Sequence, residues 1–151
     1  DTMRKVIKDV EKSRHSISKN TAERSLVVNK RYISNAICAN ACLISEKVGA
    51  KAIITATHSG YNTIKTSSYR PSAYIYAFTN NHTILNTLSL VWGVKAFYYD
   101  GGETTDQTVL ETKKVLKKYK YVKKGDMVIN IASMPAEEKG MTNMLKLSKV
   151  K

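Results

Sequence analysis

The stretch that decides the fold is residues 51–78, KAIITATHSGYNTIKTSSYRPSAYIYAF, in which two short apolar runs flank a polar, hydroxyl-rich segment. The runs Ala52–Thr55 and Tyr74–Phe78 each have the length of a buried β-strand. Between them lie a Thr/Ser/Gly turn and a short helical stretch over Tyr61–Ser68. A strand, a helix and a second strand in this order favour two parallel strands joined by a helical crossover.

The same alternation continues toward the C-terminus. Apolar runs at Val94–Tyr99 and Asp126–Ala132 predict further strands, while helices are expected near Asn81–Leu88 and from about Thr105. Strands separated by helices indicate an α/β fold with a mostly parallel sheet that is buried on both faces. The stretch Asn143–Lys149 alternates polar and apolar residues and follows its predecessor after only a loop. We therefore expect it to be an antiparallel edge strand, which makes the sheet mixed.

Two further helices are expected before the first strand. One covers Thr2–Arg14 and carries a narrow apolar stripe, formed by Met3, Val6, Ile7 and Val10. After the polar residues 15–30, a second helix ends at Val48–Gly49, because glycine is a common helix stop. Its predicted apolar face consists of Ile33, Ile37, Ala41 and Ile44.

The chain is strongly basic for its size. Its 151 residues are about one domain's worth, and 42% of them are hydrophobic. The 25 Lys and Arg against 12 Asp and Glu leave a net charge of +13. Most of the excess lies in residues 1–31 and 113–124, where it fits solvated helix faces.

Nucleic-acid binding would require more than positive charge. It calls for aromatic side chains alternating with basic ones on a sheet face, or for a recognition helix. The tyrosines cluster away from the lysine-rich helix end, in YIYAF and AFYY, so we expect no nucleic-acid partner.

Simple patterns exclude other classes of protein. No stretch reaches about 18 consecutive apolar residues and the charged N-terminus lacks a signal-peptide core, so no membrane partner is expected. Cys38 and Cys42 lie four residues apart, which fits two core thiols in a reducing cytosol. The histidines lack ligand spacing, so no metal site or cofactor is expected here. The chain opens on Asp1, which hints at a piece of a longer protein.

The usual catalytic and phosphate-cradling motifs, among them G-x-x-x-x-G-K-[ST], G-x-G-x-x-G and G-x-S-x-G, do not occur. Ser59 has no base nearby in the sequence, and we expect no catalytic residue. The loop Thr57–Thr63, THSGYNT, does carry chemistry, because it follows a strand and opens a helix. Backbone N–H groups and hydroxyls there would bind an anion. The alternative is a helix cap in which Ser59 or Thr57 satisfies the first turn, and the spacing alone leaves both open.

The blocks AKAIITATHSGYNTIKTSSYRPSAYIYAFTNN, LSLVWGVKAFYY, VKKGDMVINIAS and GMTNMLKL resemble, in order, the C-terminal domain of pyruvate kinase. YISNAICANA is similar to that domain's first helix, and Met3–Lys12 to the last helix of the preceding barrel domain. The resemblance implies residues 1–14 as a junction helix and 15–151 as an α/β domain. It also implies three α/β/α layers on a five-stranded sheet of order 3-2-1-4-5 with the last strand antiparallel.

The resemblance also implies a function. The parent enzyme is glycolytic and cytoplasmic, acts as a tetramer, and transfers phosphate from phosphoenolpyruvate to ADP with Mg²⁺ and K⁺. Its catalytic residues lie in the barrel, so this chain is expected to be non-catalytic and to serve regulation and assembly, with the other domains of its own chain as partners. The helix Ile33–Val48 and the edge strand Asn143–Lys149 are expected to form subunit contacts. The alternative is a free-standing α/β domain that binds phosphorylated metabolites.

Many relatives bind a phosphorylated effector, such as a sugar phosphate or a nucleotide, at the equivalent turn. The residues expected to hold the phosphate here are Thr57, His58, Ser59, Gly60, Tyr61, Asn62 and Thr63. This sequence has His58 where activated members often have lysine, and loops 100–106 and 133–142 would close over the other end. Those loops carry negative charges that would repel a second phosphate, namely Glu103, Asp106, Glu137 and Glu138. We therefore expect a monophosphate effector or none rather than a bisphosphate.

Overall fold

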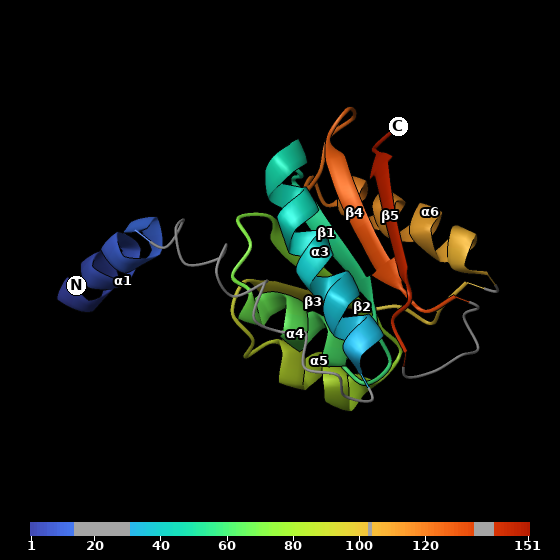
Figure 1. Cartoon of the computed structure of the whole chain (residues 1–151), viewed down its shortest axis with the longest axis horizontal. Coiled ribbons are helices and arrows are strands. Elements are labelled where there is room, and N and C mark those ends of the chain that lie inside the picture. The colour runs from blue at the N-terminus through green and yellow to red at the C-terminus, as the bar shows by residue number, and fades with distance from the viewer. Residues whose placement is uncertain (14–30, 103, 135–140) are drawn as a thin grey trace.

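The computed structural model describes residues 1–13, 31–102, 104–134 and 141–151 (Figure 1). In chain order the elements are α1 (Thr2–Ser13), α3 (Tyr32–Val48), β1 (Ala52–Ala56), α4 (Tyr61–Ser68), β2 (Tyr74–Thr79), α5 (His82–Leu88), β3 (Val94–Tyr98), α6 (Thr105–Lys118), β4 (Met127–Ala132) and β5 (Met144–Lys149). Each strand and helix predicted from the sequence is present, with bounds that differ by one or two residues at most of the ends.

The five strands form one mixed sheet in the order β3-β2-β1-β4-β5. The first four run parallel, whereas β5 pairs antiparallel with β4 and lies at the edge. In the central strand, Ile53 is in register with Ile75 on one side and with Ile129 on the other. The predicted strand order and the antiparallel last strand are confirmed.

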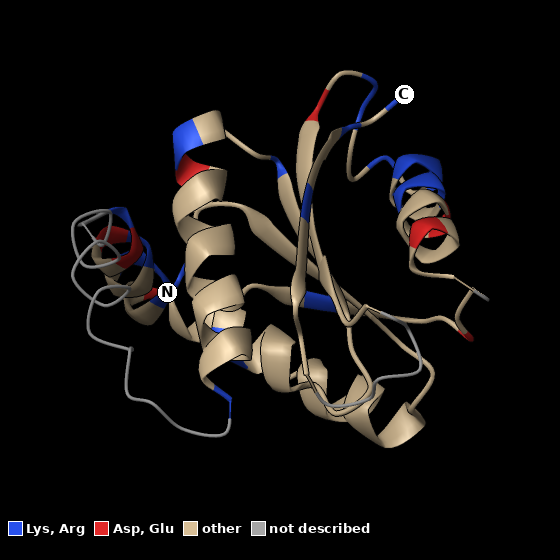
Figure 2. Ribbon diagram, turned by 45° about the vertical axis from the view of Figure 1, so that its right-hand side comes forward, with Lys and Arg blue, Asp and Glu red and all other residues tan. Residues whose placement is uncertain are grey.

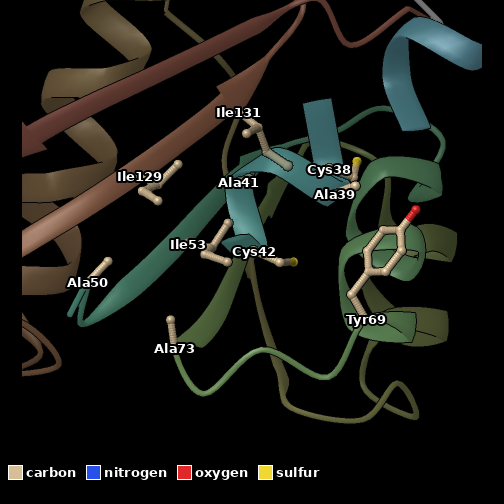
Figure 3. Packing of buried hydrophobic residues seen from close by; sticks show 10 residues of the cluster. All are labelled: Cys38, Ala39, Ala41, Cys42, Ala50, Ile53, Tyr69, Ala73, Ile129 and Ile131. Carbon is tan, nitrogen blue, oxygen red and sulfur yellow. The ribbon is translucent and has the colours of Figure 1, made fainter. Parts of the chain in front are cut away.

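Helices cover both faces of this sheet, which gives the three predicted layers (Figure 1). On one face α3, α4 and α5 pack against the strands, and the buried core there includes Ile53, Ile129 and Ile131 (Figure 3). On the other face, Leu116 of α6 packs into a second core with Ile54 and Phe78. Consecutive residues of β1 thus enter opposite cores, because side chains alternate across a strand.

The buried face of α3 differs from the prediction. Of the predicted apolar face only Ala41 is fully buried, while Ile33, Ile37 and Ile44 are half-buried. The deeply buried side consists of small residues, namely Ser34, Asn35, Cys38, Ala39, Ala41, Cys42 and Ser45. Small side chains allow α3 to lie close to α4, and bulky isoleucines fit only at the margins of such a contact.

The two cysteines confirm their predicted place in the core. Both are buried free thiols on the side of α3 that faces α4. The Sγ of Cys38 donates to the carbonyl oxygen of Asn62 at 3.5 Å, and that of Cys42 to Thr66 O at 3.8 Å. Burial raises the pKa of the Cys38 thiol to about 11. A protonated, buried thiol is a poor nucleophile, so these cysteines are structural.

Two groups of basic side chains lie on α1 and on α6, as Figure 2 shows. The predicted helix α1 is present. Its apolar stripe is uncovered in this chain, with Met3 80% accessible to solvent. The carboxylate of Glu11 accepts a hydrogen bond of 3.1 Å from the Trp92 indole. Within the described residues, none of the helices is long and apolar enough to cross a membrane.

Candidate functional site

A cleft of about 340 Å³ lies at the carboxyl ends of β1, β2 and β4. The chain runs from β1 outward to β2 and β3 and then returns to place β4 on the other side of β1. Ligands of open α/β sheets bind at such a switch in strand order. The described residues that line the cleft are Ala56, Thr57, His58, Ser59, Tyr61, Asn62, Phe78, Thr79, Asn80, Tyr99, Gly101, Gly102, Thr105, Thr108, Ala132, Ser133 and Thr142.

The turn between β1 and α4 has a well-defined backbone geometry. The Thr57 N–H donates to Phe78 O at 3.0 Å, and the Thr57 hydroxyl accepts the Gly60 N–H at 2.9 Å. Gly60 has a φ of 78°, in the left-handed region that favours glycine. A Cβ at this position would lie 3.1 Å from Cγ2 of Ile84, so the turn also packs closely against α5.

The N-terminus of α4 has no side-chain cap. Thr57 satisfies only the N–H of Gly60, which precedes the helix, while the first turn itself begins at Tyr61. The N–H groups of a first helical turn have no partner inside the helix and carry partial positive charge. The Thr57 hydroxyl therefore accepts one N–H group of the turn, that of Gly60, and no side chain caps the first turn of α4.

Two of the side chains predicted to bind phosphate make hydrogen bonds to other groups of the protein instead. The Asn62 amide donates to Ala56 O and to the Thr142 hydroxyl, both at 3.1 Å. The Thr63 hydroxyl lies 2.7 Å from that of Thr55, and both residues are fully buried. Of the seven predicted residues, Gly60 and Thr63 shape the turn without lining the cleft, and the lining ones are Thr57, His58, Ser59, Tyr61 and Asn62.

A positive charge that the sequence analysis missed lies close to the turn. The guanidinium of Arg31 is 4.1 Å above the ring of Tyr61, whose hydroxyl donates to Asn35 Oδ1 at 2.7 Å. Arg31 directly precedes α3, so α3 and β1 separate it from Tyr61 along the chain. The packing of α3 on α4 brings the two side chains together. Arg31 thus adds a basic side chain beside Tyr61 that the turn sequence itself does not indicate.

The opposite wall comes from the loops after β3 and β4. The Tyr99 hydroxyl donates to the carboxylate of Glu111, and burial together with this bond raises the pKa of Tyr99 to about 12. The Thr142 N–H donates to the Ser34 hydroxyl at 3.0 Å, which fixes the segment before β5 against α3. This wall therefore presents neutral phenol and hydroxyl groups at physiological pH.

Of the four acidic residues that were predicted to repel a second phosphate, the structure describes only Asp106. Asp106 does not line the cleft, and its carboxylate pairs with the Lys146 ammonium at 2.6 Å. The hydrogen bond from Lys146 lowers the pKa of Asp106. The other three acidic positions, Glu103, Glu137 and Glu138, lie outside the described residues. The described lining contains no carboxylate, so this part of the cleft suits an anionic or polar ligand.

The cleft holds no recognisable catalytic constellation in its described part. Ser59 and His58 are both exposed neighbours in the turn, and the described lining supplies no carboxylate to orient the histidine as a base. Nor do three or more His, Cys, Asp or Glu side chains gather closely enough to hold a metal ion in the parts of the chain that the structure describes.

Comparisons with known proteins support the resemblance seen in the sequence. The family described as "Pyruvate kinase, alpha/beta domain" matches residues 35–148. The pyruvate kinase of Lactobacillus delbrueckii subsp. bulgaricus is 37% identical over 115 residues, which are 76% of this chain and 20% of that protein. The pyruvate kinase of Staphylococcus saprophyticus is 32% identical over 146 residues, 97% of this chain and 25% of that protein. The chain thus spans about a fifth to a quarter of these relatives.

A solved structure shares the fold. A pyruvate kinase from Cryptosporidium parvum aligns with a TM-score of 0.78 at 23% identity, over 93% of this chain and 27% of that one. The matched residues 35–148 include nearly all of the sheet and both walls of the cleft. The chain belongs to the family of pyruvate kinase alpha/beta domains.

Proposed function

We propose that this chain is the C-terminal domain of a cytoplasmic, glycolytic pyruvate kinase, an enzyme that transfers phosphate from phosphoenolpyruvate to ADP with Mg²⁺ and K⁺. The domain itself is non-catalytic and serves regulation and assembly, and α1 joins it to the preceding barrel domain. The observation that carries the proposal is the match of residues 35–148 to the family. The exposed stripe of α1 and the buried free thiols of Cys38 and Cys42 are consistent with it.

The regulatory part of the proposal is that the cleft binds the single phosphate group of an effector. The uncapped first turn of α4 offers N–H donors, and the exposed Ser59 offers a hydroxyl beside them. The described lining has no carboxylate that would repel the phosphate. Arg31 adds a positive charge near Tyr61. The uncapped first turn of α4 is a place for one phosphate group, which favours a monophosphate over a bisphosphate.

Ser59→Ala is expected to weaken the binding of a sugar monophosphate roughly tenfold, because a hydrogen bond to a charged group contributes about 1.5–3 kcal/mol. The matched control is Ser68→Ala, which removes an exposed hydroxyl from the other end of α4. Isothermal titration calorimetry with sugar monophosphates and bisphosphates measures both variants. If none of these compounds releases heat with the intact protein, the effector proposal is wrong.

The alternative is a free-standing α/β domain that senses phosphorylated metabolites through the same cleft. An assay of pyruvate formation from phosphoenolpyruvate and ADP separates the two. The intact protein is expected to form pyruvate, whereas binding of sugar phosphates without any pyruvate formation would favour the free-standing domain.

We also propose that β5 and α3 form subunit contacts in a homotetramer. In the sheet β5 has one neighbour, β4, so its other edge is open in the described structure. Its Leu147 side chain is exposed, and open strand edges favour pairing with another chain.

Leu147→Lys is expected to reduce the assembly of the intact protein, because a lysine on an edge strand opposes association. Leu90→Lys changes an even more exposed leucine outside β5 and is the control. Multi-angle light scattering should show a smaller particle for the first variant alone. An unchanged tetramer in Leu147→Lys contradicts the proposed contact.

A further inference from the structure

A second groove lies at the other end of the sheet from the cleft, beside the amino ends of β2 and β3. Its volume is about 420 Å³. The lining residues are Tyr74, Ile75, Tyr76, Gly93, Val94, Lys95, Lys120 and Tyr121. They come from β2, from the edge strand β3 and from the turn that follows α6. None of them belongs to the cleft described above.

Aromatic rings form a continuous series along this groove. The ring centroids of Tyr74 and Tyr76 are 6.4 Å apart, and those of Tyr76 and Tyr121 are 5.3 Å apart. Tyr76 is buried and supports the others, whereas Tyr74 is 59% exposed and offers its ring to solvent. An exposed aromatic face next to a buried one is a platform on which a planar group can stack.

Lysines border the same rings. The Nζ of Lys95 lies 4.4 Å from the centroid of Tyr121 and also donates to its hydroxyl. The Nζ of Lys51 lies 5.8 Å from the centroid of Tyr74. The described residues that line the groove include Lys95 and Lys120 and no acidic residue. The described part of the groove therefore combines aromatic faces with positive charge, which complements a planar anion.

The backbone conformation of Lys120, which lines the groove, is unfavourable for a residue with a side chain. Lys120 has a φ of 59°, in the left-handed region. It follows the C-cap of α6, and the Tyr121 N–H donates back to Leu116 O at 3.0 Å to close the turn. Glycine is the usual residue at this position of such a helix end. A lysine is thus present where the fold by itself favours glycine.

We propose that this groove binds a small nucleotide-like anion, whose base stacks on Tyr74 and whose phosphate meets Lys95 and Lys120. Its volume is within the usual range for a small-molecule site and suits one such ligand rather than a large one. The linear sequence does not reveal this combination of aromatic and basic residues on a sheet face. Tyr74, Lys95 and Tyr121 lie far apart in the sequence and meet only through the strand order.

The probe is guanosine 5′-monophosphate, titrated at low salt into the intact protein and followed by calorimetry. Tyr74→Ala is expected to weaken binding at least about fivefold, because stacking of a base on an aromatic ring is lost. Tyr74→Phe keeps the ring and should bind as the parent does. Lys120→Gly should also weaken binding while leaving the chain at least as stable, since glycine suits the left-handed backbone.

Two further compounds test whether both the base and the phosphate are needed, and one further variant distinguishes the groove from the effector cleft. Guanosine, which lacks the phosphate, and ribose 5-phosphate, which lacks the base, should each bind this groove more weakly than the nucleotide. All titrations are made in the Ser59→Ala background, in which phosphate binding in the effector cleft is weakened. Nucleotide binding that depends on Tyr74 and Lys120 in this background is assigned to the groove whether or not the proposed function holds. The inference is overturned if the nucleotide gives no saturable signal, or if its binding survives both Tyr74→Ala and Lys120→Gly. It is also overturned if a short single-stranded oligonucleotide binds there more tightly than the mononucleotide.

Discussion

Ile53→Ala is expected to lower the free energy of unfolding by about 2–5 kcal/mol, the usual cost of truncating a buried isoleucine to alanine. Ile53 is completely inaccessible to solvent in β1, the central strand of the sheet. It lies in register between Ile75 and Ile129 and packs in the core under α3 (Figure 3). Residues of the neighbouring strands and of α3 surround this position. The surrounding side chains therefore cannot easily fill the cavity that the substitution leaves.

Urea unfolding of the chain, followed by circular dichroism, measures this loss. The control is Ile7→Ala, which makes the same change on the exposed stripe of α1 and should alter the free energy of unfolding by less than about 0.5 kcal/mol. Equal losses in the two variants would show that the core described here is not what stabilises the fold. The slope of the transition should stay the same in both variants, because the surface exposed on unfolding hardly changes.

The fold could be predicted because its signals are local. The apolar runs of β1 and β2 and the hydroxyl-rich turn between them are each readable within a few residues, and α4 has the predicted bounds Tyr61–Ser68. The buried face of α3 could not be read in this way. Hydrophobicity favoured its isoleucines, but close packing on α4 places Cys38 and Cys42 on the buried side instead.

The candidate cleft was predictable only in part, for a related reason. The Thr57–Thr63 turn opens a helix after a strand, and that pattern is visible in the sequence. Whether each side chain is available to a ligand depends on distant partners. Asn62 is engaged by Thr142, 80 positions further along the chain, and Arg31 reaches Tyr61 through the packing of α3.

Asn130 shows the same limit inside the sheet. The sequence placed it in an apolar strand, and it is indeed buried in β4. Its Nδ2 donates to Lys146 O and to the Ser148 hydroxyl, both at 3.3 Å, and so ties β4 to the edge strand. Its Oδ1 has no hydrogen-bond partner among the described residues. The polar Asn130 thus helps to join β4 to β5, a role that the apolar pattern of the strand alone does not reveal.

Gly60→Ala is expected to impair both stability and the proposed phosphate binding. An alanine at a φ of 78° carries a conformational cost of about 1–2 kcal/mol. Its Cβ would also lie 3.1 Å from Ile84 Cγ2, so the Ile84 side chain or the turn must give by a few tenths of an ångström. A shifted turn moves Thr57 and Ser59 relative to the first turn of α4. We therefore expect sugar-monophosphate binding to fall at least about tenfold, because one hydrogen bond to a charged group is lost.

Gly49→Ala is the matched control for this prediction. Gly49 has a φ of 60° at the end of α3, but a Cβ there would meet no atom within 4 Å. It should therefore show the conformational cost without the close contact and without any effect on binding. Urea unfolding and calorimetry on the two variants separate the two contributions. If both variants lose the same stability and both retain binding, the close approach of Gly60 to α5 has no part in shaping the cleft, and the turn tolerates a side chain there as readily as a solvent-exposed helix end does.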